Sequence, residues 1–186
     1  KRCPDLKEIN YNIGLSNFYL NNDSIALKYM LKEITQNREC FVCWYVVAEL
    51  FIKKEKYQLS KQSLERGKEV KLHSEYFRLL ALCYLKEQKI DSAKTYIEEG
   101  LVYFPNEWDL RYVKAQIESL SGNYKESIEI NTMLLQEEIL NDEIYLNMAN
   151  DYLLIKDSVQ ACKFYNLYYD VSNTKNENEY FDFCTN

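Results

Sequence analysis

The chain has 186 residues, of which 47% are hydrophobic, and it carries a formal net charge of −6. It contains only 4 glycines and 2 prolines, whereas a β-sandwich of this length would need many more turn residues. Acidic residues are spread along the chain, and neither a basic stripe nor a run of about 18 apolar residues occurs, which argues against nucleic-acid binding and against a membrane span.

Pairs of small residues, separated by twelve positions, recur along the chain. They are Gly14 and Ala26, Ala48 and Ser60, Ala81 and Ala93, Ala115 and Ser127, and Ala149 and Ala161. Successive pairs are 34, 33, 34 and 34 residues apart. A period in this range predicts a solenoid of helical hairpins, because each hairpin needs small residues where its two backbones come closest.

We therefore expect five helical hairpins, each with an apolar-periodic first helix, a short polar turn and a second periodic helix. In chain order the units are 7–40, 41–73, 74–107, 108–141 and 142–175. Residues 1–6 form an N-terminal flank, and residues 176–186 form a C-terminal cap or the start of a further helix.

Two columns of residues flank the first small position of every unit, four residues before it and three residues after it. The earlier column reads Asn10, Trp44, Phe77, Arg111 and Tyr145, and the later one reads Asn17, Phe51, Tyr84, Glu118 and Tyr152. Helical spacing places both columns on one face with the small residue between them. We expect this face to pack against the second helix.

The columns resemble the tetratricopeptide repeat (TPR), and the third unit matches it best. Its matching residues are Phe77, Leu80-Ala81, Tyr84, Ala93, Ile97, Gly100 and Pro105. The resemblance covers nearly the whole chain in five units. It implies an all-α fold, a right-handed α-solenoid of about ten antiparallel helices (a TPR-like superhelix).

The fourth unit departs most from the TPR pattern, because Arg111, Lys114, Glu118 and Asn131 occupy its apolar columns. Its first helix instead has apolar residues at Leu110, Val113, Ile117 and Leu120. We expect this helix to be rotated relative to those of the other units.

The residues capable of chemistry do not assemble into a catalytic or metal motif. Cys40 and Cys43 have the spacing of a redox motif or of half a zinc site, but the two further zinc ligands are missing. His73, the single histidine, is interpreted as a surface residue. We predict no catalysis, no cofactor and no metal.

The remaining cysteines leave the redox state and the compartment open. Cys83 and Cys162 are interpreted as small buried hydrophobic residues within helices. Cys3 and Cys184 lie in the flanks and could pair in an oxidising compartment.

The TPR resemblance also implies a concave groove lined by the first helix of every unit. By alignment, the exposed groove residues are Glu8, Tyr11, Leu15, Phe18 and Tyr19; Val42, Tyr45, Glu49 and Lys53; Glu75, Arg78, Leu82 and Lys86; Asp109, Tyr112 and Gln116; and Glu143, Leu146 and Asn150. Aromatic residues anchor many protein interfaces, so we expect Tyr11, Phe18, Tyr45 and Tyr112 to anchor a partner.

The groove composition favours one kind of partner. TPR proteins that bind chaperone tails hold a terminal carboxylate with cations, but the corresponding positions here include Tyr11, Leu15 and Glu75. Binding of an acidic tail is therefore disfavoured. We predict a non-catalytic interaction module for a protein or peptide segment with basic and apolar residues. The alternative is a structural scaffold subunit that self-associates as a homo-oligomer or packs within a larger assembly.

Overall fold

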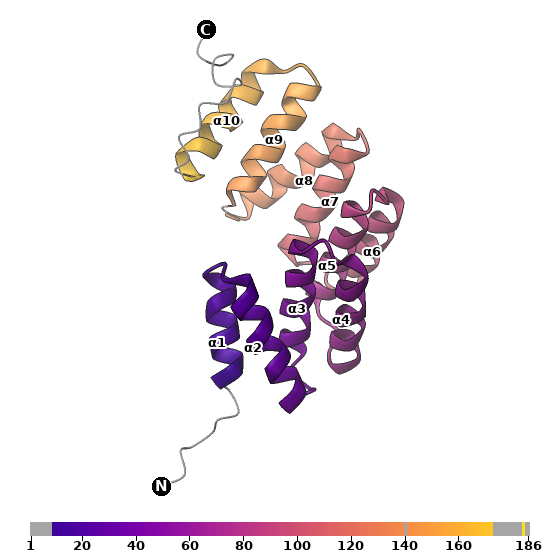
Figure 1. Cartoon of the computed structure of the whole chain (residues 1–186). Helices are drawn as coiled ribbons and strands as arrows, with labels where there is room; N and C mark the ends of the chain where they lie inside the picture. Colours follow the sequence, from indigo (N-terminus) through magenta and orange to yellow (C-terminus); the bar gives the residue numbers. More distant parts are fainter. Residues whose placement is uncertain (1–8, 140, 173–183, 185–186) are drawn as a thin grey trace. The chain divides into compact units, whose positions relative to one another are not determined.

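The computed structural model describes residues 9–139, 141–172 and 184, and these residues form ten helices (Figure 1). In chain order the helices are α1 (Ile9–Tyr19), α2 (Asp23–Gln36), α3 (Phe41–Lys53), α4 (Tyr57–Val70), α5 (Ser74–Lys86), α6 (Ile90–Tyr103), α7 (Trp108–Leu120), α8 (Tyr124–Gln136), α9 (Asp142–Leu154) and α10 (Ser158–Ser172). They pack in sequential antiparallel pairs, which confirms the predicted all-α class.

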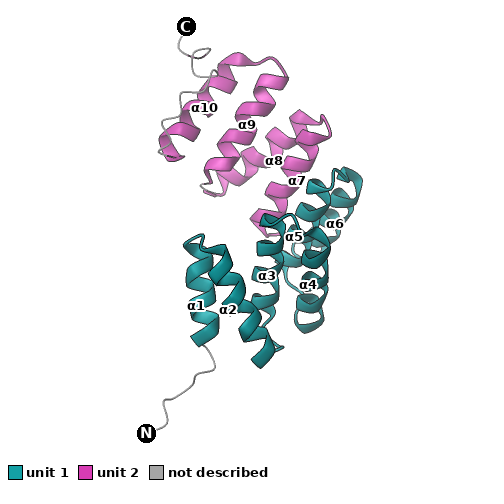
Figure 2. Ribbon diagram, viewed as in Figure 1, with its two compact units in different colours: residues 1–104 teal, residues 105–186 magenta. Residues whose placement is uncertain are grey.

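The chain divides into two compact units, residues 1–104 with α1–α6 and residues 105–186 with α7–α10 (Figure 2). The limits of the five repeats stay a prediction. The flank 1–6 lies outside the described residues, as does 176–186 apart from Cys184. Within the described part of the chain, no helix is long and apolar enough to cross a membrane.

The small residues lie where the two helices of each pair meet. Ala81 and Ala93 are fully buried, as are Ala48 and Ser60. A Cβ atom added to Gly14 would lie 3.1 Å from the side chain of Met30 on α2. The predicted register of close approach is therefore observed.

Every first helix ends in the same left-handed turn. After the first helices, positive φ occurs at Asn21, Glu55, Gln88, Gly122 and Lys156, which recur at the repeat period. Glu138, after the second helix α8, also has positive φ. In the third pair, the Gln88 N–H bonds to the Leu85 carbonyl and the Lys89 N–H bonds to the Tyr84 carbonyl, each at 2.9 Å. This is the Schellman motif, which satisfies carbonyls at the helix end and turns the chain into the second helix.

The predicted rotation of α7 is wrong. Its buried residues Leu110, Val113, Ala115 and Ile117 occupy the same repeat positions as the buried Cys43, Val46, Ala48 and Leu50 of α3. Leu120 was expected to be buried but is 62% exposed. The helix keeps its register because the polar residues in its columns find hydrogen-bonding partners: Arg111 bonds to Glu137, and Glu118 accepts a bond from Asn123.

Two disulfides correct part of the interpretation of the cysteines. Cys162 is bonded to Cys184, with a Cα–Cα distance of 5.3 Å, so it is not a free core residue and Cys184 does not pair with Cys3. Cys40 is bonded to Cys43 across the first turn of α3. Cys83 is a free, fully buried cysteine, as expected.

Candidate functional site

A cavity of about 260 Å³ lies within the first compact unit, on the first helices of its three hairpins. It is lined by Leu15, Phe18 and Tyr19 of α1; Phe41, Val42, Tyr45, Val46 and Glu49 of α3; and His73, Glu75 and Leu79 at the start of and within α5. We call this cavity the groove pocket. Its lining is mainly apolar, with two carboxylates.

Three aromatic rings in the lining of the groove pocket, those of Phe41, Tyr45 and His73, lie close together. The ring of Phe41 lies 6.2 Å from that of Tyr45 in an edge-to-face arrangement and 6.0 Å from that of His73. Together with the apolar side chains of Val46 and Leu79, they provide a surface for an apolar group.

Tyr45 does not have the exposure that the sequence analysis predicted. It is only 4% exposed, because its ring packs over Gly67, where a Cβ atom would lie 3.0 Å from the Tyr45 Cε1. Its hydroxyl donates a 2.8 Å hydrogen bond to the Lys71 carbonyl, and burial raises the pKa of Tyr45 to about 12. Tyr45 is therefore a fixed wall of the pocket.

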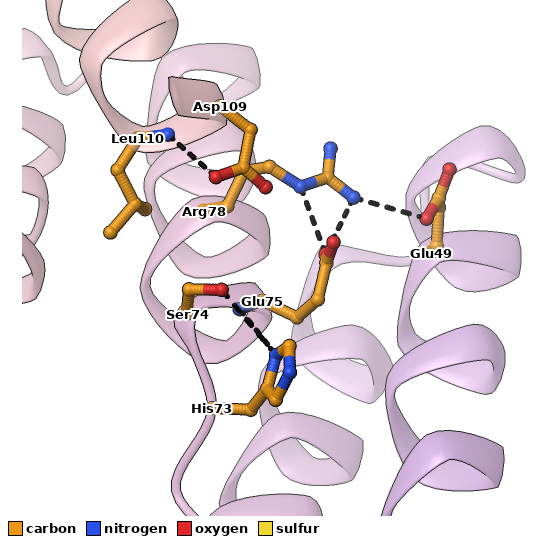
Figure 3. Close-up of polar contacts among 7 residues, drawn as sticks. All are labelled: Glu49, His73, Ser74, Glu75, Arg78, Asp109 and Leu110. Carbon is orange, nitrogen blue, oxygen red and sulfur yellow. Dashed lines mark hydrogen bonds and ion pairs between the residues drawn. The ribbon is translucent and has the colours of Figure 1, made fainter. Parts of the chain in front are cut away.

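The polar edge of the groove pocket is a cluster of Glu49, Glu75 and Arg78 (Figure 3). Arg78 contacts Glu75 Oε2 through Nε at 2.9 Å and through Nη2 at 2.6 Å, and Nη2 lies 3.3 Å from Glu49 Oε2. Each of the three side chains is between 20% and 31% exposed. A ligand in the pocket therefore meets two carboxylates that already engage one guanidinium.

His73 was interpreted as a bland surface residue, but it lines the groove pocket and begins α5. Its Nδ1 accepts a 3.3 Å hydrogen bond from the backbone N–H of Glu75, as Figure 3 shows. Its ring lies 6.5 Å from that of Phe104. Its position was the signal available in the sequence, since His73 directly precedes the periodic residues of α5.

The other predicted groove residues of the first compact unit lie outside the pocket lining. Lys53 pairs with Asp23 at 3.3 Å, and its ammonium lies 5.1 Å from the ring centre of Phe18. Tyr11 is half-buried against the apolar cluster of α2 and α3, and Lys86 is exposed. Glu8 lies outside the described residues.

The predicted residues of the second compact unit are Asp109, Tyr112, Gln116, Glu143, Leu146 and Asn150. Tyr112 is 7% exposed, so the prediction of an exposed anchor does not hold; burial raises its pKa, and its hydroxyl accepts a 3.1 Å hydrogen bond from Gln116. Asp109 Oδ1 accepts a hydrogen bond from the Leu110 N–H, and Asn150 Oδ1 accepts one from the Tyr165 hydroxyl. These residues do not line the groove pocket.

Phe41, Val46 and Leu79 line the pocket but are not among the predicted groove residues. Val46 and Leu79 occupy the same position in successive units, so the repeat alignment held the signal that they lie side by side. Phe41 precedes the periodic part of its helix, and its place depends on the chain path between α2 and α3.

No protein-family model matches this sequence. Solved structures share its fold at low identity. A chain of the APC/C hetero-tetramer Cut9–Hcn1 matches with a TM-score of 0.84 and 14% identity, over 92% of this chain and 34% of that chain. This chain thus spans about a third of the length of that relative.

Two TPR proteins extend the comparison. One from Parabacteroides merdae ATCC 43184 has a TM-score of 0.80 and 14% identity, over 97% of this chain and 71% of that chain. YrrB, described as a TPR protein with an unusual peptide-binding site, has a TM-score of 0.57 and 14% identity, over 89% and 86% of the two chains. The fold is therefore the TPR α-solenoid that the sequence predicted. Proteins with this fold generally mediate protein–protein interactions and are typically non-catalytic.

Proposed function

We propose that this chain is a non-catalytic interaction module that holds a peptide segment of a protein partner at the groove pocket. An apolar side chain of the segment fills the pocket, and a basic residue next to it lies at the edge formed by Glu49 and Glu75. The observation that carries this proposal is the mainly apolar cavity with two carboxylates in its lining. The peptide-binding site described for YrrB, which has a related fold, supports it.

The charges at the pocket favour a basic rather than an acidic segment. Glu49 and Glu75 supply two negative charges, and the nearby Arg78 supplies one positive charge that both already engage. An acidic ligand would have to displace a carboxylate from the guanidinium, whereas a Lys or Arg side chain adds to the cluster. Unlike charges also steer the encounter of partners, while apolar contacts supply most of the affinity.

A selection from a random peptide library tests the proposal, with two variants as a matched pair. Val42→Glu introduces a charge into the pocket lining, and Val102→Glu introduces the same charge at a residue of α6 that is 79% exposed. A glutamate in the first turn of α3 is compatible with the helix dipole, so folding should be preserved. We expect selected peptides to combine aromatic or aliphatic residues with Lys or Arg.

We expect Val42→Glu to weaken the binding of a selected peptide by about tenfold or more, and Val102→Glu to leave it unchanged. Binding should also weaken as the salt concentration rises, because part of the attraction is electrostatic. Selection of acidic peptides, or sensitivity to Val102→Glu alone, would contradict the proposal. If light scattering shows self-association that Val102→Glu abolishes, the scaffold function takes its place.

A further inference from the structure

The disulfide between Cys40 and Cys43 lies directly beside the groove pocket. The two residues between the cysteines, Phe41 and Val42, both line the pocket. We propose that Cys40 and Cys43 form a reversible thiol–disulfide site whose redox state sets the shape of the groove pocket. The regulatory part of this inference rests on the proposed function, whereas the redox chemistry does not.

The place of Cys40 on α3 favours its reduced form. Cys40 is the residue that caps the N-terminus of α3, and its Sγ accepts a 3.3 Å hydrogen bond from the backbone N–H of Cys43. Once the disulfide opens, this N–H and the positive end of the helix dipole stabilise a thiolate on Cys40. Stabilising the reduced form makes a disulfide easier to reduce.

The burial of the two sulfur atoms determines which one reacts. Cys43 is fully buried against residues of α2, including Met30 and Ile34, whereas Cys40 is only half-buried. An external thiolate therefore reaches Cys40 and not Cys43. The pair combines one accessible sulfur with one protected sulfur that can close the bond again.

The exchange proceeds in two balanced steps with an external dithiol as reductant. A thiolate of the dithiol attacks Cys40 Sγ, the Cys40–Cys43 bond breaks, and Cys43 leaves as a thiolate that takes up a proton. The second thiolate of the dithiol then attacks the dithiol sulfur that is bonded to Cys40, the bond between that sulfur and Cys40 Sγ breaks, and Cys40 leaves as a thiolate. The dithiol is oxidised to a disulfide, and the two cysteines are reduced.

The bond links the capping residue to the third residue of α3, so it holds the first turn of the helix closed. The Phe41 ring in this turn contacts the Tyr45 and His73 rings, and the Lys71 ammonium lies 4.7 Å from its centre. When the bond opens, the covalent link is lost, and only non-covalent contacts hold the turn: the capping hydrogen bond, the bond from the Trp44 N–H to the Cys40 carbonyl, and the ring contacts are among them. Phe41 and Val42 then gain conformational freedom, and the apolar lining that they contribute to the pocket changes.

The disulfide between Cys162 and Cys184 provides an internal control. Cys162 lies within α10 rather than at a helix N-terminus, and Cys184 packs against the core of the second compact unit. In α10, Cys162 is the fifth residue, so among the described residues no helix-end N–H group is placed to stabilise its thiolate as at Cys40. We therefore expect this bond to resist reduction under conditions that open the Cys40–Cys43 bond.

A titration of the full chain with defined ratios of reduced to oxidised dithiothreitol tests the redox site. Alkylation followed by peptide mass spectrometry reports each cysteine pair separately. We expect the Cys40–Cys43 bond to open at a ratio roughly tenfold lower than the Cys162–Cys184 bond, with the helical circular dichroism retained. Reduction of Cys40–Cys43 only when the helical signal is lost would overturn the proposal.

Nuclear magnetic resonance of the side chains of Phe41, Val42 and His73 tests the coupling to the pocket without any ligand. We expect these signals to shift on reduction and to shift in the same way in a Cys40→Ser variant kept under non-reducing conditions. A Cys162→Ser, Cys184→Ser variant should leave them in place. Reduction without any shift at the pocket would overturn the coupling, and since no peptide takes part, neither result depends on the proposed function.

Discussion

The third and fourth helix pairs share one backbone plan but differ in what joins the two helices. In α5–α6, the ring of Phe77 stacks on that of Tyr103 with centres 5.8 Å apart. At the equivalent positions of α7–α8, Arg111 bonds to both carboxylate oxygens of Glu137 at 2.6 Å. The two partners have changed together, so the repeat tolerates a polar contact in place of a ring contact when both sides change.

The column three residues after the small residue also has a ring contact in the third pair and a polar contact in the fourth. Tyr84 of α5 stacks on Tyr96 of α6 with centres 5.3 Å apart. At the position of Tyr84, the fully buried Glu118 of α7 accepts a 2.7 Å hydrogen bond from Asn123, the capping residue of α8. A buried carboxylate is tolerated there because a nearby amide compensates part of its desolvation.

The first helix pair follows the polar plan at both positions. Asn10 donates a 2.9 Å hydrogen bond to Gln36, at the positions of Arg111 and Glu137. Asn22 likewise donates a 3.1 Å hydrogen bond to Asn17. Polar contacts therefore replace ring contacts in two helix pairs, with uncharged residues only in the first pair and with Arg111, Glu137 and Glu118 as charged residues in the fourth.

The largest expected effect comes from truncating the side chains of the column that lies four residues before the small residue, which contains Phe77 and Arg111. Phe77 is 1% exposed, so Phe77→Ala removes a buried ring, and we expect a loss of about 3–5 kcal/mol in the free energy of unfolding. Arg111→Ala should cost less than half as much, since Arg111 and Glu137 remain partly in contact with water. Chemical denaturation of both variants measures the difference, and equal losses would show that the ion pair matters as much as the stacked rings.

The shared backbone plan can be tested at the small residues. Ala81 and Ala115 are both fully buried at the closest approach of their helices, so Ala81→Leu and Ala115→Leu should each cost about 1–3 kcal/mol through overpacking. The measurement is again the denaturation midpoint. A midpoint for Ala115→Leu equal to that of the parent would mean that the fourth pair is packed differently from the third.

The fold was predictable because it depends on a repeated pattern. Ala81 and Ala93 predicted which residues of α5 and α6 come closest, and the same twelve-residue spacing predicted the corresponding contacts in the other four pairs. The predicted rotation of α7 failed because the polarity of Arg111 and Glu118 was taken to mean exposure. Their hydrogen-bonding partners, Glu137 and Asn123, are the residues that cap the two ends of α8, and a helical pattern within α7 does not reveal them.

The candidate site was predictable only in part. Alignment placed Leu15, Glu49 and Glu75 on the groove side, and all three line the pocket. The burial of Tyr45 could not be predicted from the pattern of α3, because it depends on the space that Gly67 leaves on α4. The disulfide of Cys162 was also beyond the pattern, since Cys184 lies outside the repeats.

A smaller effect is expected at Asp151 of α9, which takes the repeat position of the apolar Cys83. Asp151 is fully buried, the Ser119 hydroxyl donates to its Oδ1, and its Oδ2 has no hydrogen-bond partner among the described residues. Burial raises the pKa of this carboxyl, and the hydroxyls of Ser119 and Ser127 lower it in part. The group therefore stabilises the fold while protonated, and this stability is lost as the pH rises from the unfolded-state pKa through the higher folded-state pKa.

We expect Asp151→Asn to raise the free energy of unfolding by about 1 kcal/mol at neutral pH, and the gain to vanish under acidic conditions where the parent carboxyl is protonated. Denaturation of variant and parent across the pH range measures this. Asp91→Asn, at an exposed position of α6, is the control and should show no such trend. A gain that is the same at every pH would assign the effect to packing rather than to the charge.

The smallest expected effect concerns the turns of the two helix pairs. The fourth pair has Gly122 at the left-handed position, with φ of 84°, whereas the third pair has Gln88 there, with φ of 61°. A left-handed conformation costs a residue with a Cβ atom about 1–2 kcal/mol, and glycine loses part of this advantage because its unfolded chain is more flexible. We expect Gln88→Gly to stabilise the protein by about 0.5 kcal/mol and Gly122→Ala to destabilise it by a similar or slightly larger amount. No atom other than those of its chain neighbours lies within 4 Å of a Cβ placed on Gly122, so the stability lost in Gly122→Ala is conformational and not steric.

Gln88→Ala keeps the Cβ atom and should leave the denaturation midpoint near that of the parent. If Gln88→Ala stabilises the protein as much as Gln88→Gly does, the gain comes from removing the long side chain, and the backbone explanation of the turn is wrong.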